Sequence, residues 1–285
     1  MDENVKRMKD EWDKELKATP GLALWPVGGT PGFRAEYGQS EPSIMPFLAE
    51  TGGRPRGAVV VCPGGGYELK APHEGQPIAR MLNAAGIHAF VLDYRVIPYT
   101  AEYPLMDVQR AIRTVRYRSA SWGVNADKVA VLGFSAGGHM TIMASTHFDA
   151  GNPGSADPVE RQSCRPDAQI PCYPLVSFKP IIKESNEREW IARAFGPGHT
   201  AKSIAWSFGD EAVRADTPPA FLWGTWDDFL YEQWPPYLEA LKRNKVEFAY
   251  HLFPRGGHGM GLAEGNAQAK HWPALCTAWL KEQGF

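Results

Sequence analysis

The chain has 285 residues, of which 44% are hydrophobic and 22% are charged, with a formal net charge of −2. This length is enough for one large α/β core, and the composition is that of a globular protein. The charge balance gives no reason to expect nucleic acid binding, which depends on clustered lysines and arginines. We interpret the densest basic run, "RAIRTVRYR" from Arg110 to Arg118, as a helix whose arginines face water around buried Ile112 and Val115.

The cysteines and the N-terminal segment bear on compartment and topology. The four cysteines are Cys62, Cys164, Cys172 and Cys276. Their spacings are irregular and include no CxxC pair, so we expect neither a disulfide framework nor a zinc site. The start, "MDENVKRMKDEWDKELK", is charged throughout and has no apolar signal region. Because the chain also has no run of about 18 apolar residues, we expect no membrane span. A cytoplasmic protein is the default, although a secreted form without its leader would have the same sequence.

Strand and helix patterns alternate along most of the chain. Expected strands cover residues 58–62, 88–94, 128–133, 169–178, 219–224 and 247–253. Expected helices cover residues 76–86, 104–123, 139–146, 235–244 and 268–283. This order predicts a single α/β domain over residues 1–285, with a mostly parallel sheet and helices on both faces. Residues 1–50 form an N-terminal extension, and residues 179–216 break the alternation as an insertion or lid.

The stretch "KVAVLGFSAGGHM" places a serine at the end of a buried strand and surrounds it with small residues. Gly133 to Gly137 fit the pattern G-x-S-x-G, in which a nucleophile sits on a sharp strand-to-helix turn. Side chains two residues before and after Ser135 would collide in that turn, and glycine removes the collision. The pattern, preceded by "VAVL" and followed by a helix, predicts that Ser135 is a nucleophile.

A serine that attacks a carbonyl group needs donors for the developing oxyanion. The backbone N–H of Ala136 follows the nucleophile directly and lies at a helix N-terminus. Further donors are expected from "PGGGY" (Pro63 to Tyr67), whose glycines allow the main chain to approach a ligand. A phosphate-binding loop is the competing interpretation, but the position three after Gly66 is Leu69, so the glycine fingerprint fails.

The serine also needs a histidine base and a carboxylate that orients the base. In sites of this type the chain order is Ser, then Asp or Glu, then His. "FLWGTWDD" places two candidates after a strand; we favour Asp227, three residues after Gly224, and expect Asp228 to support the loop through backbone N–H groups. His258 in "PRGGHGMG" is the preferred base because flanking glycines leave its imidazole free to reach the serine. His251 and His271 are interpreted as packing residues.

Several segments together carry a family resemblance. They are "VVVCPGGGY", "HEGQPIARMLNAAGIHAFVLDYRV", "YPLMDVQRAIRTVRYRSASWGV", "GFSAGGHM", "GTWDDF" and "GGHGMGL". They resemble the α/β-hydrolase esterases of the BD-FAE type, the acetylxylan esterase-like group of bacterial xylan-associated enzymes. The likeness covers most of the chain from about Gly57 onward, but neither the first fifty residues nor the insertion. It implies an α/β-hydrolase fold with these site residues: Ser135 as nucleophile, Asp227 as acid, His258 as base, and Gly65, Gly66 and Ala136 as oxyanion donors.

The sequence departs from the family at one point, because "GTWDDFLYEQ" lacks the Val-Pro that often follows this aspartate in relatives. The departure leaves the choice of aspartate open and suggests a different pocket edge. The resemblance favours hydrolysis of short acyl esters, acetyl above all, on sugars. Four aromatic residues suit stacking against a pyranose ring: Tyr67, Trp190, Trp206 and Trp226. Tryptophans in an insertion are, however, more often packing residues. The candidate substrate contacts are Tyr67, His73, Glu74, Trp226 and Met260.

The expected enzyme is therefore a serine esterase that acts on a small-molecule or oligosaccharide ester. It needs no cofactor, and no residue cluster has metal-ligand spacing: "HEGQP" resembles the start of HExxH but lacks the second histidine. Alternatives with the same three residues are an amide hydrolase like kynurenine formamidase, a lipase-like or general short-chain carboxylesterase, and an oligopeptidase. A catalytically silent binding module is the alternative from another class. The sequence leaves the oligomeric state and the acyl length open.

Overall fold

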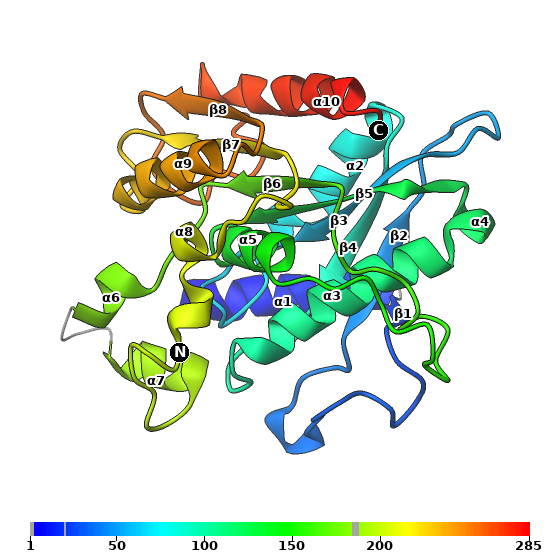
Figure 1. Ribbon diagram of the computed structural model, residues 1–285, viewed down its shortest axis with the longest axis horizontal. Helices are drawn as coiled ribbons and strands as arrows, with labels where there is room; N and C mark the ends of the chain where they lie inside the picture. The colour runs from blue at the N-terminus through cyan, green and yellow to red at the C-terminus, as the bar shows by residue number, and fades with distance from the viewer. Residues whose placement is uncertain (1–2, 20, 184–187) are drawn as a thin grey trace.

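An eight-stranded sheet runs through the centre of the computed structural model, which describes residues 3–19, 21–183 and 188–285 (Figure 1). The strand order is β1-β2-β4-β3-β5-β6-β7-β8. Two strands at one edge, β1 (Leu22–Ala23) and β2 (Ser43–Phe47), pair antiparallel, and β2 also pairs antiparallel with β4 (His88–Asp93). The other pairs are parallel and involve β3 (Arg56–Cys62), β5 (Val124–Phe134), β6 (Ala168–Cys172), β7 (Ala220–Thr225) and β8 (Phe248–Phe253). The predicted mostly parallel sheet is confirmed.

Helices cover both faces of the sheet (Figure 1). One face carries α2 (Gln76–Ala84) and α10 (Trp272–Glu282). The opposite face carries α3 (Glu102–Tyr117), α5 (Ala136–Thr146) and α9 (Trp234–Arg243). This arrangement buries both sides of the parallel strands, which is why residues 58–62 of β3 and residues 129–134 of β5 form nearly continuous apolar runs. None of the described helices is both long enough and apolar enough to cross a membrane.

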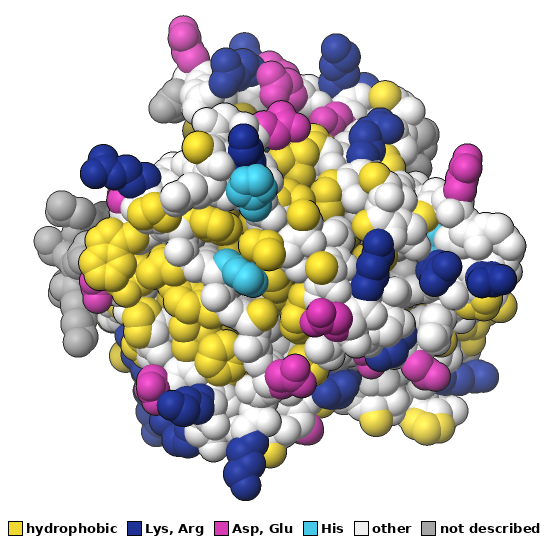
Figure 2. Space-filling model, turned by 90° about the horizontal axis from the view of Figure 1, so that it is seen from above, with side chains coloured by type: hydrophobic (Ala, Val, Ile, Leu, Met, Phe, Trp, Pro, Cys, Tyr) yellow, Lys and Arg dark blue, Asp and Glu magenta, His cyan; other side chains and the backbone are white. Residues whose placement is uncertain are grey.

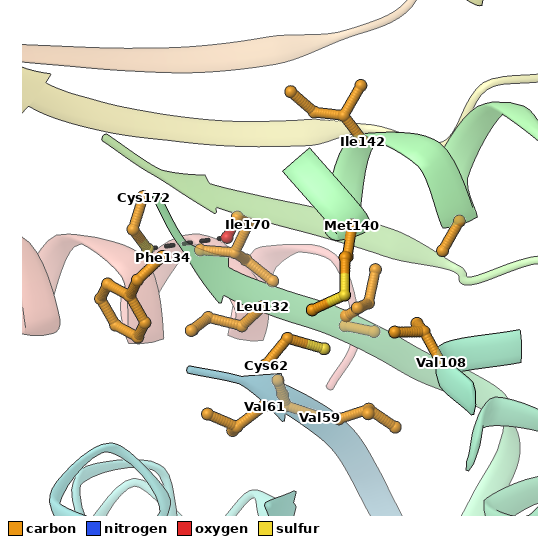
Figure 3. Close-up of a cluster of buried hydrophobic side chains, with 14 of the residues drawn as sticks. Val59, Val61, Cys62, Val108, Leu132, Phe134, Met140, Ile142, Ile170 and Cys172 are labelled. Atoms are coloured by element: carbon orange, nitrogen blue, oxygen red, sulfur yellow. Dashed lines mark hydrogen bonds between the residues drawn. The ribbon is translucent and has the colours of Figure 1, made fainter. Parts of the chain in front are cut away.

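The buried core covers both faces of the central strands, and Figure 3 shows part of it around β3, β5 and α5. Val59 and Val61 of β3 and Leu132 of β5 have no exposed surface, and Met140 of α5 is 1% exposed. The branched side chains of β3 fill the space beside Leu132, so the strand that ends at the candidate nucleophile is held rigidly. All four cysteines are free and buried, and burial raises the pKa of the Cys62 thiol. They pack as small hydrophobic side chains.

Some boundaries differ from the predicted ones for local reasons. The strand expected over residues 169–178 ends at Cys172, because Tyr173 adopts a positive φ of 33° and Pro174 follows. The helix expected over 104–123 ends at Tyr117 and continues as the short α4 (Ser119–Trp122). The final helix begins at Trp272 rather than at residue 268, with a proline in its first turn.

The N-terminal extension contains a helix that the sequence analysis did not predict, α1 (Glu3–Ala18). Its Trp12 is 3% exposed and donates from Nε1 to Asp93 Oδ1 at 2.9 Å, at the carboxyl end of β4. The same carboxylate accepts from Ser40 Oγ at 2.7 Å and pairs with Lys70 Nζ at 2.8 Å. One buried aspartate therefore ties the extension to the sheet. Residues 1, 2 and 20 of the extension lie outside the described residues.

The expectation that the arginines of the basic run face water is wrong for two of them. Arg110 is 3% exposed and pairs with both Asp157 and Glu160. Arg113 is 7% exposed and holds Asp149 in a two-point contact at 2.7 and 2.8 Å. The long loop after α5 folds back over α3 and supplies these carboxylates. A charged helix face is thus buried by partners more than thirty residues away, which local periodicity cannot reveal.

The expected insertion over residues 179–216 contains α6 (Lys179–Lys183), α7 (Arg188–Phe195) and α8 (Gly209–Ala212), of which α6 and α7 stand out from the body of the molecule (Figure 1). Residues 184–187 lie outside the described residues. The ring of Trp190 stacks on Phe178 with centroids 5.4 Å apart, and its Nε1 donates to the carbonyl oxygen of Gly66 at 3.1 Å. Arg193 pairs with Glu68. Helix α7 therefore contacts the "PGGGY" loop directly.

Candidate active site

The backbone at Ser135 has the strained geometry that the glycine pattern predicts. Ser135 has φ 52° and ψ −114°, between the end of β5 and the first residue of α5. A Cβ added to Gly133 would lie 2.1 Å from the carbonyl oxygen of Gly137, and one added to Gly137 would lie 2.1 Å from that of Cys62. Both distances are impossible for real atoms, so glycine is required at each position. Positive φ at a non-glycine residue costs energy that the surrounding core must supply.

His258 lies between Ser135 and a buried carboxylate. Its Nε2 is 2.7 Å from Ser135 Oγ, and its Nδ1 is 2.8 Å from Asp228 Oδ2. The side chain of Asp228 has no exposed surface, and that of His258 is 21% exposed. The rings of Tyr173 and Phe229 contact the imidazole with centroids 5.1 and 4.7 Å away. A carboxylate on Nδ1 fixes the proton there and leaves the Nε2 lone pair directed at the serine hydroxyl.

The preference for Asp227 as the partner of His258 is wrong. Asp227 accepts hydrogen bonds from the backbone N–H groups of Gly256 and Gly257, each at 2.9 Å, and so anchors the loop that carries the histidine. The Gly257 bond is also the main cause of the lowered pKa of this carboxyl. The roles expected for the two aspartates are exchanged, although Asp228 also accepts from Leu230 N at 2.8 Å.

The physical reason for this error is the end of the strand. The predicted strand ends at Gly224, whereas β7 continues through Thr225. Three residues beyond Thr225 is Asp228. A shift of one residue in the strand end therefore moves the partner of His258 by one residue.

The "PGGGY" loop places main-chain donors beside the serine. Gly66 and Ala136 line the same cavity as Ser135. Among the described residues, the N–H groups of Gly65 and Gly66 donate no hydrogen bond, whereas Gly64 N donates to Glu74 Oε2 at 2.7 Å. Helix α5 begins at Ala136, so its positive end faces the same space. These groups are available to an anionic oxygen, and Gly64 is not.

Glu74 joins this loop to the histidine loop. Its Oε2 accepts from Gly64 N, and its Oε1 accepts from the hydroxyl of Tyr173 at 2.6 Å. The same hydroxyl accepts from Gly261 N at 2.8 Å. Glu74 is 2% exposed and Tyr173 is fully buried, so the chain of bonds is shielded from water. Glu74, expected from the sequence to contact the substrate, instead supports the loop from beneath. Tyr173 carries no signal in the sequence and was not among the expected site residues.

A second buried network lies on the other side of the loop. The Tyr67 hydroxyl is 2.6 Å from His139 Nδ1, and His139 Nε2 is 2.8 Å from the carbonyl oxygen of Ser207. Because that carbonyl can only accept, Nε2 carries the proton and Nδ1 accepts from the tyrosine. Burial lowers the pKa of His139 to about 4 and raises that of Tyr67. Tyr67 is therefore a packed residue of the loop and not an exposed stacking surface.

The cavity at Ser135 has a volume of about 330 Å³. The residues that line it are Gly66, Ser135, Ala136, Leu175, Pro180, Ile181, Trp190, Phe229, Leu230 and Gln233. Figure 2 shows hydrophobic side chains gathered over a broad part of one face of the molecule, with histidine side chains among them. Of the aromatic residues singled out in the sequence, Trp190 lies in this lining. Among the described residues, the other three, Tyr67, Trp206 and Trp226, do not belong to this lining.

The remaining candidate substrate contacts are not in this lining, as far as the described residues go. Trp226 is 59% exposed and packs on Tyr231 with ring centroids 4.5 Å apart. His73 Nε2 is 3.1 Å from the carbonyl oxygen of Gly259, which links it to the histidine loop. Met260 is partly buried beside Gly256, where its sulfur would lie 2.6 Å from an added Cβ. His73 and Met260 therefore contact the loop that carries His258, whereas Trp226 packs on Tyr231.

A serine on a strained strand-to-helix turn, a histidine after the last strand and a carboxylate after the strand before it define a hydrolase site of the α/β type. The family model of the alpha/beta hydrolase fold matches residues 59–262, and the chain belongs to that family.

Three of the proteins that this chain resembles carry names from ester and xylan hydrolysis. A solved structure, an acetyl ester-xyloside bifunctional hydrolase from Caldicellulosiruptor lactoaceticus, is 38% identical with a TM-score of 0.86; the match covers 94% of this chain and 97% of that one. An endo-1,4-beta-xylanase B from Butyrivibrio fibrisolvens is 32% identical over 81% of this chain and 36% of its own length. An acetylxylan esterase from Xylanibacter ruminicola is 32% identical over 72% of this chain and 41% of its own length. The chain thus spans less than half the length of these two curated relatives.

Proposed function

We propose that the protein is a serine esterase that hydrolyses short acyl esters, acetyl esters above all, of carbohydrate alcohols. The observation that carries the proposal is the continuous chain of contacts from Ser135 Oγ through His258 to buried Asp228, at 2.7 and 2.8 Å, opening into a cavity. The names of two relatives support acetyl esters of xylan-derived sugars as substrates: one is an acetylxylan esterase, and the 38% identical solved structure is an acetyl ester-xyloside bifunctional hydrolase.

The geometry suggests the following reaction. His258 Nε2 takes the proton of Ser135 as Oγ attacks the ester carbonyl carbon, and the carbonyl oxygen becomes an oxyanion bound by the N–H groups of Gly66 and Ala136, with Gly65 as a further candidate donor. The tetrahedral intermediate collapses, the C–O bond to the alcohol breaks, and His258 returns its proton to the leaving oxygen. Water then attacks the acyl-enzyme with His258 as base, which releases the acid and restores the serine. Asp228 orients the imidazole and stabilises its protonated form.

The cavity supports a small substrate. Its volume of about 330 Å³ is near the lower end of the roughly 300–1,000 Å³ typical of ligand sites. Its walls are mainly apolar, which suits a short acyl group and one face of a sugar ring. We propose that residues 179–216 act as a cap on the single hydrolase domain, because Pro180, Ile181 and Trp190 from this segment line the cavity.

Substitution of Ser135 by alanine tests the nucleophile. We expect the variant to fold normally, to lose reaction with a fluorophosphonate probe, and to hydrolyse 4-nitrophenyl acetate several orders of magnitude more slowly. Ser121→Ala is the matched control, because Ser121 is an exposed serine on α4. Wild-type-like turnover by a folded Ser135→Ala protein would exclude this mechanism.

A substrate panel tests the alcohol and the acyl group. We expect the acetylated xylo-oligosaccharide to be hydrolysed with a higher kcat/KM than long-chain aryl esters or N-formylkynurenine. The opposite ranking would favour a general carboxylesterase, and preference for N-formylkynurenine would favour an amide hydrolase.

A further inference from the structure

The cavity at Ser135 has one polar side chain in its wall whose hydrogen-bonding capacity is only half used. Of the side chains that the structure describes in this lining, Ser135 and Gln233 carry hydroxyl or amide groups, and Trp190 has already committed its N–H to Gly66. The other lining side chains are aliphatic, aromatic or proline. A glutamine in such a wall therefore needs an explanation.

The orientation of the Gln233 amide is determined by its neighbours. Its Oε1 accepts from the backbone N–H of Val176 at 3.0 Å and from that of Ser177 at 2.9 Å. Both groups are donors, so they must face the oxygen, and a flipped amide would place two donors against two donors. Both acceptor positions of the oxygen are occupied, and Nε2 is turned away from the Val176–Ser177 backbone.

The amide nitrogen is left for a ligand. Among the described residues, Gln233 Nε2 donates no hydrogen bond, although it carries two N–H groups. The anchoring backbone is close to the nucleophile, because Leu175 N donates to the carbonyl oxygen of Ser135 at 3.1 Å. Trp234 Nε1, on the residue after Gln233, donates to the carbonyl oxygen of Pro174 at 2.9 Å. Gln233 is thus held against residues 174–177, the segment that contacts Ser135, both by its own amide oxygen and by the neighbouring Trp234.

We propose that Gln233 is a specificity-determining residue that donates a hydrogen bond from Nε2 to an oxygen of the sugar alcohol in the substrate. This inference rests on the proposed function and deepens it. An N–H group enclosed by an apolar substrate would lose its water partner and gain nothing, which costs binding energy. A sugar supplies ring and hydroxyl oxygens that accept the bond. Gln233 therefore selects esters of polyhydroxylated alcohols against esters of plain alcohols of the same size.

The test compares two esters whose alcohols have similar rings, monoacetylated methyl xyloside and cyclohexyl acetate. The readout is the ratio of kcat/KM for the sugar ester to kcat/KM for the cyclohexyl ester. Gln233→Met removes the donor at nearly constant length, and Gln233→Glu keeps an acceptor oxygen for Val176 and Ser177 but cannot donate. We expect both variants to lower the ratio about 10- to 100-fold, the range for one lost hydrogen bond to a substrate. Gln268→Met, at an exposed glutamine, is the matched control and should keep the wild-type ratio.

Each outcome bears on the donor role of Gln233, on the proposed esterase function, or on both. The donor role of Gln233 is wrong if either variant keeps the wild-type ratio. Damage to the Val176–Ser177 backbone would lower kcat/KM equally for both esters and leave the ratio unchanged, so this outcome also counts against the donor role. A wild-type enzyme that hydrolyses both esters without preference would overturn the inference and leave the esterase proposal standing. A wild-type enzyme inactive on both esters and on 4-nitrophenyl acetate would overturn both.

Discussion

Exchange of Asp228 for asparagine is expected to lower kcat for 4-nitrophenyl acetate about 1,000- to 10,000-fold, as in triads where the same change leaves the geometry intact. The asparagine Oδ1 can still accept from Leu230 N, as the aspartate does at 2.8 Å. Its Nδ2 then faces His258 Nδ1 and donates to it. The imidazole must carry its proton on Nε2, toward the Ser135 hydroxyl, where it cannot accept the serine proton.

The size of the expected loss in kcat follows from the burial of Asp228 and from the direct contact of its carboxylate with His258. Each tenfold change in rate corresponds to about 1.4 kcal/mol in the barrier, so the expected loss is about 4–5.5 kcal/mol. A loss of this size is reasonable because the Asp228 side chain has no exposed surface and its charge faces the imidazole at 2.8 Å without intervening water. The buried charge would otherwise stabilise the imidazolium that forms in the transition state.

Asp227→Asn is the matched control, one residue away in the same turn. Asp227 is exposed, and its Oδ1 accepts from Gly256 N and Gly257 N at 2.9 Å, while Oδ2 is a longer second acceptor for Gly256 N at 3.3 Å. An asparagine oxygen can therefore keep the two shorter bonds. We expect a loss of less than about tenfold. The assay is steady-state hydrolysis of 4-nitrophenyl acetate, with circular dichroism to verify folding. The assignment would be refuted if Asp227→Asn were the more damaging change, or if Asp228→Asn lost less than tenfold.

Two further predictions concern the buried networks beside the candidate oxyanion loop. Tyr173→Phe removes the hydroxyl that bonds both Glu74 and Gly261, and should lower the free energy of unfolding in urea by about 1–3 kcal/mol; an unchanged urea midpoint would contradict the bonding role. His139 has its pKa lowered to about 4 by burial, whereas an unfolded histidine titrates near 6.5. The unfolded chain therefore binds one more proton than the folded chain between these pH values. The neutral histidine contributes about 3 kcal/mol to the free energy of unfolding above pH 6.5, and this contribution is lost as the pH falls toward 4. His139→Gln should show a smaller loss of stability between pH 7 and pH 4.5 than the wild type, and equal losses would contradict this reasoning.

The turn that carries the candidate nucleophile could be predicted from sequence because its determinants are local. Gly133 and Gly137 are required by contacts within a few residues of Ser135 and with the end of the neighbouring strand, and the pattern is written in five consecutive positions. The order of strands and helices was predictable for the same reason, since a buried parallel strand needs a continuous apolar run. His258 was identified from its place after the last strand.

The partner of His258 needed the tertiary structure. Asp227 and Asp228 are chemically identical neighbours, and the choice depends on where β7 ends and on which carboxylate faces the core. The supports of the site were equally out of reach. Glu74 and Tyr173 are 99 positions apart, and nothing near either residue indicates the other.

The alternation of apolar strand and helix patterns in the sequence indicated an α/β fold, and a short local pattern indicated where the candidate nucleophile stands. Tertiary structure alone decided which aspartate pairs with the histidine, that Arg110 and Arg113 are buried, and that Gln233 faces the cavity. The physical reason is the range of the interactions. Backbone strain and hydrophobic periodicity act over a few residues, whereas hydrogen bonds and ion pairs join groups that only the packed sheet brings within 3 Å of each other.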